Sequence, residues 1–227
     1  MTSTSARGLF RATGNSSTHI VRTDDGYERS TEAPREAHDF YPTPPDVTRA
    51  LLSVEGQRIA EVAQDKHIWE PAAGDGAMVR EFLSLGFTVI TSDIIDRGCG
   101  ADMVDFLTAT RRPADVLITN PPYNLINARD GKGRWLTHAM GLGCRYVALF
   151  LNWDWPAAAG LAPILAEHPI SRVYVCRWKV DFTGKGSPPQ RNAWFIWDAD
   201  WTNETALRFL DRADARQSEM FGPQRHG

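Results

Sequence analysis

The sequence has only three cysteines, Cys99, Cys144 and Cys176, and no two of them form a Cys-x-x-Cys pair. Because they are far apart and odd in number, they argue against a disulfide framework and against a structural zinc site. The histidines show no spacing typical of metal ligands, and no Ser-His-Asp or Walker pattern is present. We therefore predict that the chain binds no metal and that its cysteines are reduced and packed.

Long apolar runs and a surplus of positive charge are also missing. No stretch approaches the length of a membrane span, and the N-terminus has no hydrophobic signal core. We expect a soluble protein of the cytoplasm with no membrane partner. The formal net charge is -3, so nucleic-acid binding would require local basic patches instead of general basicity.

Length and composition indicate one domain. The 227 residues, of which 42% are hydrophobic, suffice for a single domain with a full core. Residues 1–38 are rich in Ser, Thr, Arg and Glu and show no hydrophobic period, which predicts a disordered or loosely attached arm. We assign residues 39–212 to the domain and residues 213–227 to a polar tail.

Strand-like and helix-like patterns alternate along the domain. Apolar runs predict strands, helical spacing predicts helices, and their alternation predicts an α/β fold whose parallel sheet has helices on both faces. Residues 170–178 and 192–197 are joined by a loop without room for a crossover helix, so we expect an antiparallel hairpin at the edge of the sheet. The other predicted strands are 68–71, 87–92, 114–119 and 145–152, and the predicted helices are 47–54, 77–85 and 135–142.

The segment Asn120-Pro121-Pro122-Tyr123 ends the apolar run 114–119. A residue before proline avoids the helical region, and both prolines have a fixed φ and no N–H, so the turn is rigid. It presents the Asn120 side-chain oxygen and the Pro121 carbonyl as acceptors at the carboxyl edge of the sheet, where open α/β sheets bind ligands. Two acceptors that grip both hydrogens of an amine on an aromatic ring or an amide would localise and aim its lone pair. A plain strand-ending turn is the alternative interpretation.

A glycine loop follows the strand 68–71. Gly74 and Gly76 lie where a backbone approaches a ligand closely. Val79 stands where the dinucleotide-binding fingerprint has Gly or Ala, and Glu70 and Asp75 add negative charge. These features suit a ligand that carries an ammonium and a sulfonium better than they suit a pyrophosphate.

Two carboxylates lie at or near the ends of the next strands. Asp93 closes the strand 87–92, where it can accept hydrogen bonds from ribose hydroxyls, or it can cap a helix. Asp105 can reach the adenine amino group of a cofactor or the amine of the target. Phe106 can flank the adenine ring, with packing in the core as the alternative.

The glycine loop, Asp93, Asp105-Phe106 and the Asn-Pro-Pro-Tyr turn, in this order, resemble the S-adenosylmethionine-dependent amino methyltransferases over about residues 40–197. The likeness is greatest to the DNA adenine-N6 methyltransferases, as a small phage-type or orphan member. The segment 40–44, Phe-Tyr-Pro-Thr-Pro, resembles the N-terminal cofactor motif of this family. The resemblance implies a Rossmann-like class I methyltransferase fold, with a mostly parallel seven-stranded sheet that ends in an antiparallel hairpin. It also implies S-adenosylmethionine as cofactor and DNA as partner.

The resemblance assigns roles to single residues. Asn120 and the Pro121 carbonyl hold the amine of a base that has left the helix, within the catalytic turn that Pro122 completes. Tyr123 stacks on this base, and Phe182 covers its other face. The implied cofactor-binding residues are Tyr41, Thr43, Glu70, Pro71, Ala72, Gly74, Gly76, Asp93, Asp105 and Phe106.

We expect no separate target-recognition domain, because Gly133 and Trp135 follow the turn closely and only a short stretch follows Trp197. Base reading would fall to the basic loops 127–134 and 179–191, in which Lys132, Arg134, Lys185 and Arg191 would contact phosphate unless both loops are simply solvated. We predict a short or relaxed target site, or an accessory partner that supplies recognition. The alternatives are methyl transfer to RNA or to a protein glutamine amide, and a nucleic-acid binder without catalysis.

Overall fold

The computed structural model describes residues 20–23, 26–29, 41–128, 133–182 and 190–212. Clustering of contacts divides the chain into two units, Met1–Asp39 and Phe40–Gly227. In the first unit, β1 (Ile20–Thr23) pairs antiparallel with β2 (Gly26–Arg29). The sequence analysis did not foresee this pairing, because two four-residue segments are too short to show a hydrophobic period. The remainder of the predicted arm and the tail 213–227 lie outside the described residues.

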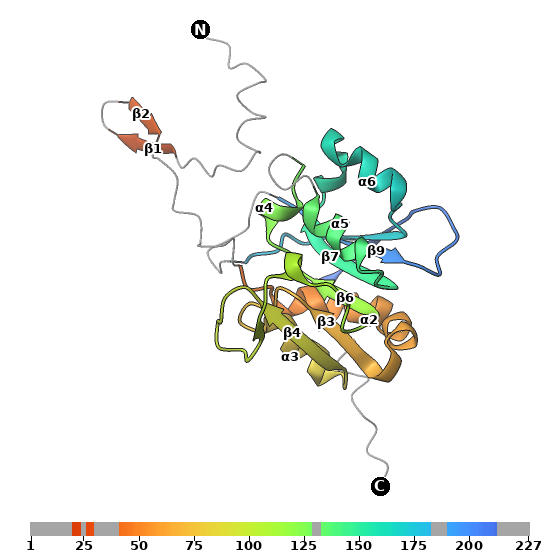
Figure 1. The fold of residues 1–227 in the computed structure, drawn as a ribbon. Helices are drawn as coiled ribbons and strands as arrows, with labels where there is room; N and C mark the ends of the chain where they lie inside the picture. Colours follow the sequence, from red (N-terminus) through yellow and green to blue (C-terminus); the bar gives the residue numbers. More distant parts are fainter. Residues whose placement is uncertain (1–19, 24–25, 30–40, 129–132, 183–189, 213–227) are drawn as a thin grey trace. The chain divides into compact units, whose positions relative to one another are not determined.

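The second unit is built on one sheet of eight strands in the order β10-β8-β9-β7-β6-β3-β4-β5 (Figure 1). Neighbouring strands run parallel except at β9, which is antiparallel to both β7 and β8. The predicted α/β class, with a mostly parallel sheet and an antiparallel hairpin, is confirmed. The strands are β3 (His67–Glu70), β4 (Thr88–Asp93), β5 (Asp102–Met103), β6 (Val116–Thr119), β7 (Tyr146–Asn152), β8 (Arg172–Cys176), β9 (Asn192–Asp198) and β10 (Ala206–Leu210).

Two details of the predicted sheet are wrong. The sheet has eight strands instead of seven, and the antiparallel strand β9 lies inside it instead of at its edge. Every residue of β9 is buried, so this strand needs a neighbour on each side. The additional strand β10 takes the edge, where its three exposed residues meet solvent without cost to the core.

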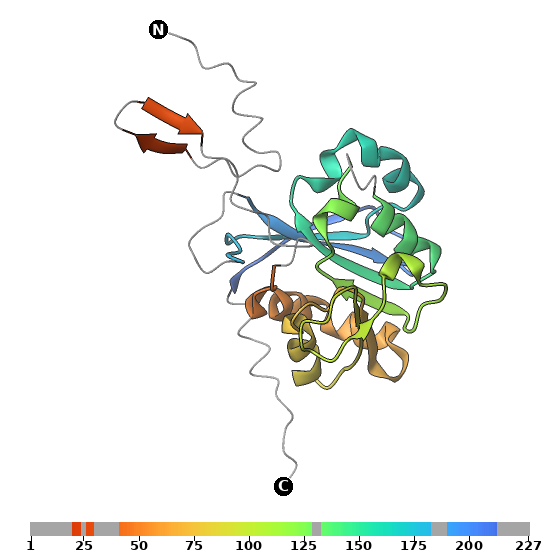
Figure 2. The ribbon, with the colours of Figure 1, turned by 60° about the vertical axis from the view of Figure 1, so that its left-hand side comes forward.

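Helices cover both faces of the sheet, as predicted. One core cluster joins α2 (Pro45–Val62) and α3 (Ala77–Ser84) to Val116 and Ile118 of β6. The other joins α5 (Arg134–Gly141) to Leu117 of the same strand, and α6 (Ala162–Glu167) packs against it. Figure 2 shows these two helical groups on opposite sides of the sheet. Within the described ranges, no helix has the length and apolar character that a membrane crossing requires.

A buried ion cluster fastens α2 to the amino ends of the parallel strands. The Arg172 guanidinium donates to Glu55 Oε1 at 2.7 Å and to Asp198 Oδ2 at 2.9 Å. Tyr174 and Tyr146 donate their hydroxyls to the same glutamate. Burial favours a raised pKa at Asp198, but hydrogen bonds from Arg58 and Arg172 outweigh it and lower that pKa. Every buried charge at this end therefore has a partner.

Candidate active site

The carboxyl ends of three neighbouring strands carry the predicted polar residues. In the order β6-β3-β4, Thr119 ends β6, Glu70 ends β3 and Asp93 ends β4. Because these strands are parallel, their last residues meet at one edge of the sheet. Asn120 and the glycine loop follow directly, so the two main predicted motifs lie side by side.

The Asn-Pro-Pro-Tyr turn is positioned by a contact from far upstream. Asn120 donates from Nδ2 to Thr43 Oγ1 at 3.1 Å. Its Oδ1 is buried and has no hydrogen-bond partner among the described residues. Pro121 is buried and Pro122 has φ -63° and ψ 121°, so the helix α4 (Tyr123–Ile126) begins at once. The turn thus holds one acceptor fixed and unused at the edge of the sheet.

Thr43 is buried, and its contact with Asn120 joins the segment 41–44 to the Asn-Pro-Pro-Tyr turn. Aromatic side chains pack next to this segment. Tyr41 meets Phe182 edge to face, with ring centroids 6.4 Å apart, and Phe182 packs against Phe150 at 6.2 Å. Phe182 therefore packs between Tyr41 and Phe150, against the hydrophobic core.

The glycine loop has a left-handed backbone at two positions, which glycine adopts without strain. Gly74 has φ 57° and Gly76 has φ 78°, both in the left-handed region. A Cβ on Gly76 would lie 2.9 Å from the Cβ of Cys99, so the loop after β4 needs this glycine for close packing. The predicted residues Pro71 and Ala72 lie in the same loop between Glu70 and Gly74.

Asp93 fastens the glycine loop to the end of β4. Its Oδ2 accepts from the Gly74 amide at 2.8 Å, and its Oδ1 accepts from the Ile95 amide and from Arg97, each at 3.0 Å. A carboxylate has about four acceptor positions, and these three hydrogen bonds leave one position on Oδ2. The structure uses Asp93 for a loop contact that neither sequence alternative included.

Glu70 is a buried carboxyl group without a normal hydrogen bond. Neither of its oxygens has a partner of standard geometry among the described residues, and the Thr119 hydroxyl beside it has none either. Burial raises the pKa of Glu70 well above its usual value, and the Asp93 charge adds to the rise, while the Thr119 side chain and the Ala72 backbone oppose it. A cationic ligand in this place would favour the ionised form.

Asp105 and Phe106 come after β5. Asp105 accepts from the Leu107 amide at 2.9 Å and so caps the short 3-10 turn Phe106–Thr108. The Phe106 ring is buried and stacks on Trp135 with centroids 3.9 Å apart. Since Trp135 covers one face and Trp69 lies 5.3 Å away, the structure favours the core-packing alternative for Phe106.

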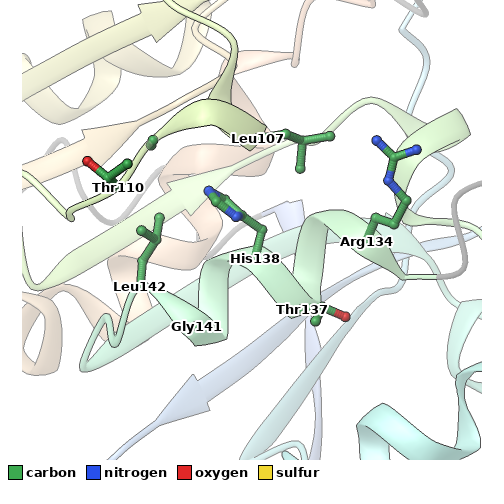
Figure 3. A pocket seen from close by; sticks show the side chains of 8 residues that line it. Leu107, Thr110, Arg134, Thr137, His138, Gly141 and Leu142 are labelled. Atoms are coloured by element: carbon green, nitrogen blue, oxygen red, sulfur yellow. The ribbon is translucent and has the colours of Figure 1, made fainter.

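An open groove of about 570 Å³ lies between this turn and α5 (Figure 3). His138 lies in its middle and Arg134, the first residue of α5, at one end. The crossover from β5 to β6 contains only a three-residue 3-10 turn, so no full helix fills the space beside α5. This groove was not predicted from the sequence, although the short segment between β5 and β6 indicated that no full helix would pack there.

The predicted DNA-contacting cations are only partly visible. Arg134 and Arg191 are exposed, whereas Lys132 and Lys185 lie outside the described residues. Arg191 accepts from the backbone amide of Trp153 at 2.9 Å and donates to the Arg177 carbonyl, also at 2.9 Å. Trp153 follows β7 directly and is 41% exposed, so an aromatic ring lies at the carboxyl end of the strand next to β6, and the two arginines lie near it at the ends of β8 and β9.

An exposed isoleucine at the same edge escaped the sequence analysis. Ile94 follows Asp93 and is 56% exposed, and Met103, which ends β5, and Val104, which follows it, are also exposed. Exposed apolar side chains at the carboxyl ends of β4 and β5 suit a planar ring. The signal was an apolar residue directly after a strand-ending aspartate. Among the described residues, no group of three or more His, Cys, Asp or Glu could hold a metal ion.

No protein-family model and no curated protein matches the sequence. Solved structures do match. A proposed RNA methyltransferase from Pyrococcus horikoshii is 16% identical, with a TM-score of 0.57 over 73% of this chain and 90% of that chain. The chain has the class I methyltransferase fold. A proposed class I S-adenosylmethionine-dependent methyltransferase from Listeria monocytogenes has 14% identity and a TM-score of 0.57, over 78% of this chain and 68% of that one.

A third structure with the class I methyltransferase fold is a methyltransferase subunit of a type I restriction-modification system from Streptococcus thermophilus. It is 15% identical, with a TM-score of 0.52, and covers 75% of this chain. The present chain spans about half of its length, 47%. At these identities the likeness concerns the fold.

Proposed function

We propose that this chain transfers a methyl group from S-adenosylmethionine to the N6 amino group of adenine in DNA. The observation that carries the proposal is Asn120 Oδ1, a buried acceptor without a partner that Thr43 holds at the carboxyl edge. A buried oxygen of this kind costs about 1–3 kcal/mol when it stays unpaired. A donor such as an exocyclic amine would satisfy it.

The residues around the glycine loop fit the cofactor. Glu70 offers a buried carboxyl group to an ammonium, the free acceptor position of Asp93 suits a ribose hydroxyl, and the exposed Ile94 suits the adenine ring. Gly74 and Asp105 belong to the same edge. When bound there, S-adenosylmethionine supplies an electrophilic methyl group on a sulfonium.

The catalytic turn would activate the amine by position and by charge. Asn120 Oδ1 and the Pro121 carbonyl accept its two hydrogens, so its lone pair stops delocalising into the ring and points at the methyl group. The same two oxygens stabilise the positive charge that grows on nitrogen. Removal of one preorganised partner of this type costs about 10²–10³ in rate.

Aromatic side chains would hold the flipped base. Tyr123 begins α4 directly after the two prolines and can stack on the ring. The exposed Trp153 and the cations Arg191 and Arg177 lie at the ends of β7, β9 and β8, where the nucleic-acid backbone would pass. Stacking and phosphate contacts of this kind do not depend strongly on sequence, which supports a short or relaxed target site.

A labelling experiment tests the proposal. The protein is incubated with labelled S-adenosylmethionine and with duplex DNA, single-stranded DNA, RNA or a glutamine-containing protein, and the methylated atom is identified by mass spectrometry. We expect N6-methyladenine in DNA from the wild type and about 10²–10³-fold slower formation by Asn120→Ala. Label on RNA or on an amide would overturn the choice of DNA, and no label on any substrate would overturn methyl transfer itself.

A further inference from the structure

The outer edge of β10 has open backbone groups. Ala206 donates to the Ser171 carbonyl at 3.0 Å, and the Leu210 carbonyl accepts from the Arg177 amide at 2.9 Å. These residues therefore face β8. Because successive residues of a strand point their N–H and C=O to opposite sides, those of Leu207 and Phe209 point away from the sheet. No other described strand pairs with this side of β10.

The same two residues expose apolar side chains. Leu207 is 53% exposed and Phe209 is 52% exposed. Natural sheets protect an open edge with proline, with very short strands or with charges on the edge. β10 has five residues and no proline. Its one charged side chain, Arg208, lies over the Tyr174 ring of β8, 5.8 Å from the centroid, with its Nη1 3.4 Å from the hydroxyl.

We propose that β10 pairs antiparallel with β10 of a second copy of this chain, around a two-fold axis at Arg208. In this register Leu207 of each copy lies opposite Phe209 of the other. Both residues face outward, so each such pair exchanges two backbone hydrogen bonds. The apolar side chains cover one another on one face. The contact uses the same surface on both copies and closes after two subunits.

Charge complementarity supports a second copy as the occupant. Beyond the strand, which ends at Leu210, the register brings Glu204 of one copy toward Arg212 of the other, where a helical turn begins, and symmetry makes this pair twice. Both residues are exposed, although Arg212 also contacts Asp46 at 3.1 Å. The two Arg208 side chains meet at the axis, but each is held over its own Tyr174, toward β8 and away from the new neighbour.

A cross-linking experiment tests the register. In the proposed dimer the two Arg208 residues form a non-hydrogen-bonded pair with a Cα separation of about 4.5 Å, which lies within disulfide range. We expect Arg208→Cys to form a covalent dimer on mild oxidation much faster than Leu83→Cys. Leu83 lies on α3 and is 54% exposed, so this control has an equally accessible thiol. Equal cross-linking of the two variants would overturn the register.

Sedimentation of the full-length protein tests the dimer itself. The wild type should sediment as a dimer and Phe209→Glu as a monomer. The circular dichroism spectrum of Phe209→Glu should show that this variant remains folded. Glu204→Arg should raise the dimer dissociation constant about tenfold, and Glu204→Arg combined with Arg212→Glu should restore it. A monomeric wild type, or no rescue by the double reversal, would overturn the proposal. Neither readout involves methyl transfer, so this result stands apart from the proposed function.

Discussion

Replacement of Glu70 by Gln should stabilise the protein more strongly as the pH rises. Burial keeps the pKa of this carboxyl group well above the ordinary 4.5. A group of this kind contributes stability that is fully present below its unfolded pKa and is lost as the pH rises toward its folded pKa. Glutamine has the same shape and does not titrate, and its amide can donate to the unpaired Thr119 hydroxyl.

The size of the effect follows from one proton. A single group changes the free energy of unfolding by at most about 1.4 kcal/mol per pH unit inside its window. Over two units the wild type should therefore lose up to about 2.7 kcal/mol relative to Glu70→Gln. For a folded unit of this size, 1 kcal/mol shifts the melting temperature by about 2–4 °C. The two melting curves should thus separate by about 5–11 °C.

Thermal unfolding between about pH 5 and about pH 8 measures this difference. Glu61→Gln is the control, because Glu61 is an exposed carboxyl group on α2 with 51% of its side chain accessible. Its melting temperature should follow that of the wild type at every pH. The difference should shrink when S-adenosylmethionine is added, since its ammonium favours the ionised Glu70. Parallel curves for the wild type and Glu70→Gln would refute the account of this residue.

Three further predictions concern catalysis, the fold and nucleic-acid contact. Asn120→Ala should lower kcat about 10²–10³-fold, and Thr43→Val, which removes only the hydroxyl that orients Asn120, about tenfold; equilibrium dialysis should show a nearly unchanged Kd for S-adenosylmethionine in Asn120→Ala. Arg172→Leu should cost about 3–5 kcal/mol in urea unfolding, whereas Arg145→Gln, which removes an exposed ion pair with Asp200, should leave the urea midpoint nearly unchanged. Trp153→Ala should weaken DNA binding, measured by fluorescence anisotropy, by about 1–3 kcal/mol.

The sequence predicted those elements whose boundaries have a local cause. β6 and α3 occur where they were expected, because prolines end the first and glycine loops flank the second. The placement of β9 between β7 and β8 has no local signal, since strand order depends on contacts between distant segments. β10 was missed because its exposed residues alternate weakly with the buried ones.

The site shows the same division. Glu70, Asp93 and Asn120 each end or follow an apolar run, so their meeting at one edge could be predicted from strand direction alone. The contact between Thr43 and Asn120 joins residues 77 positions apart and could not be predicted in this way. The sequence also could not separate the two roles of Phe106. The nearby Trp135 favours the core role, because it stacks on the Phe106 ring.

The two ends of the sheet differ in how their buried polar groups are satisfied, and this difference favours a ligand at the carboxyl edge. At the amino ends, Glu55 accepts from Arg172, Tyr174 and Tyr146, so its charge is fully paired. At the carboxyl ends, the oxygens of Glu70 and Asn120 are buried without partners among the described residues. Each unpaired group costs about 1–3 kcal/mol. Acceptors left open at one end of a fold that pairs its charges at the other support the proposal that donors such as an ammonium and an exocyclic amine bind there.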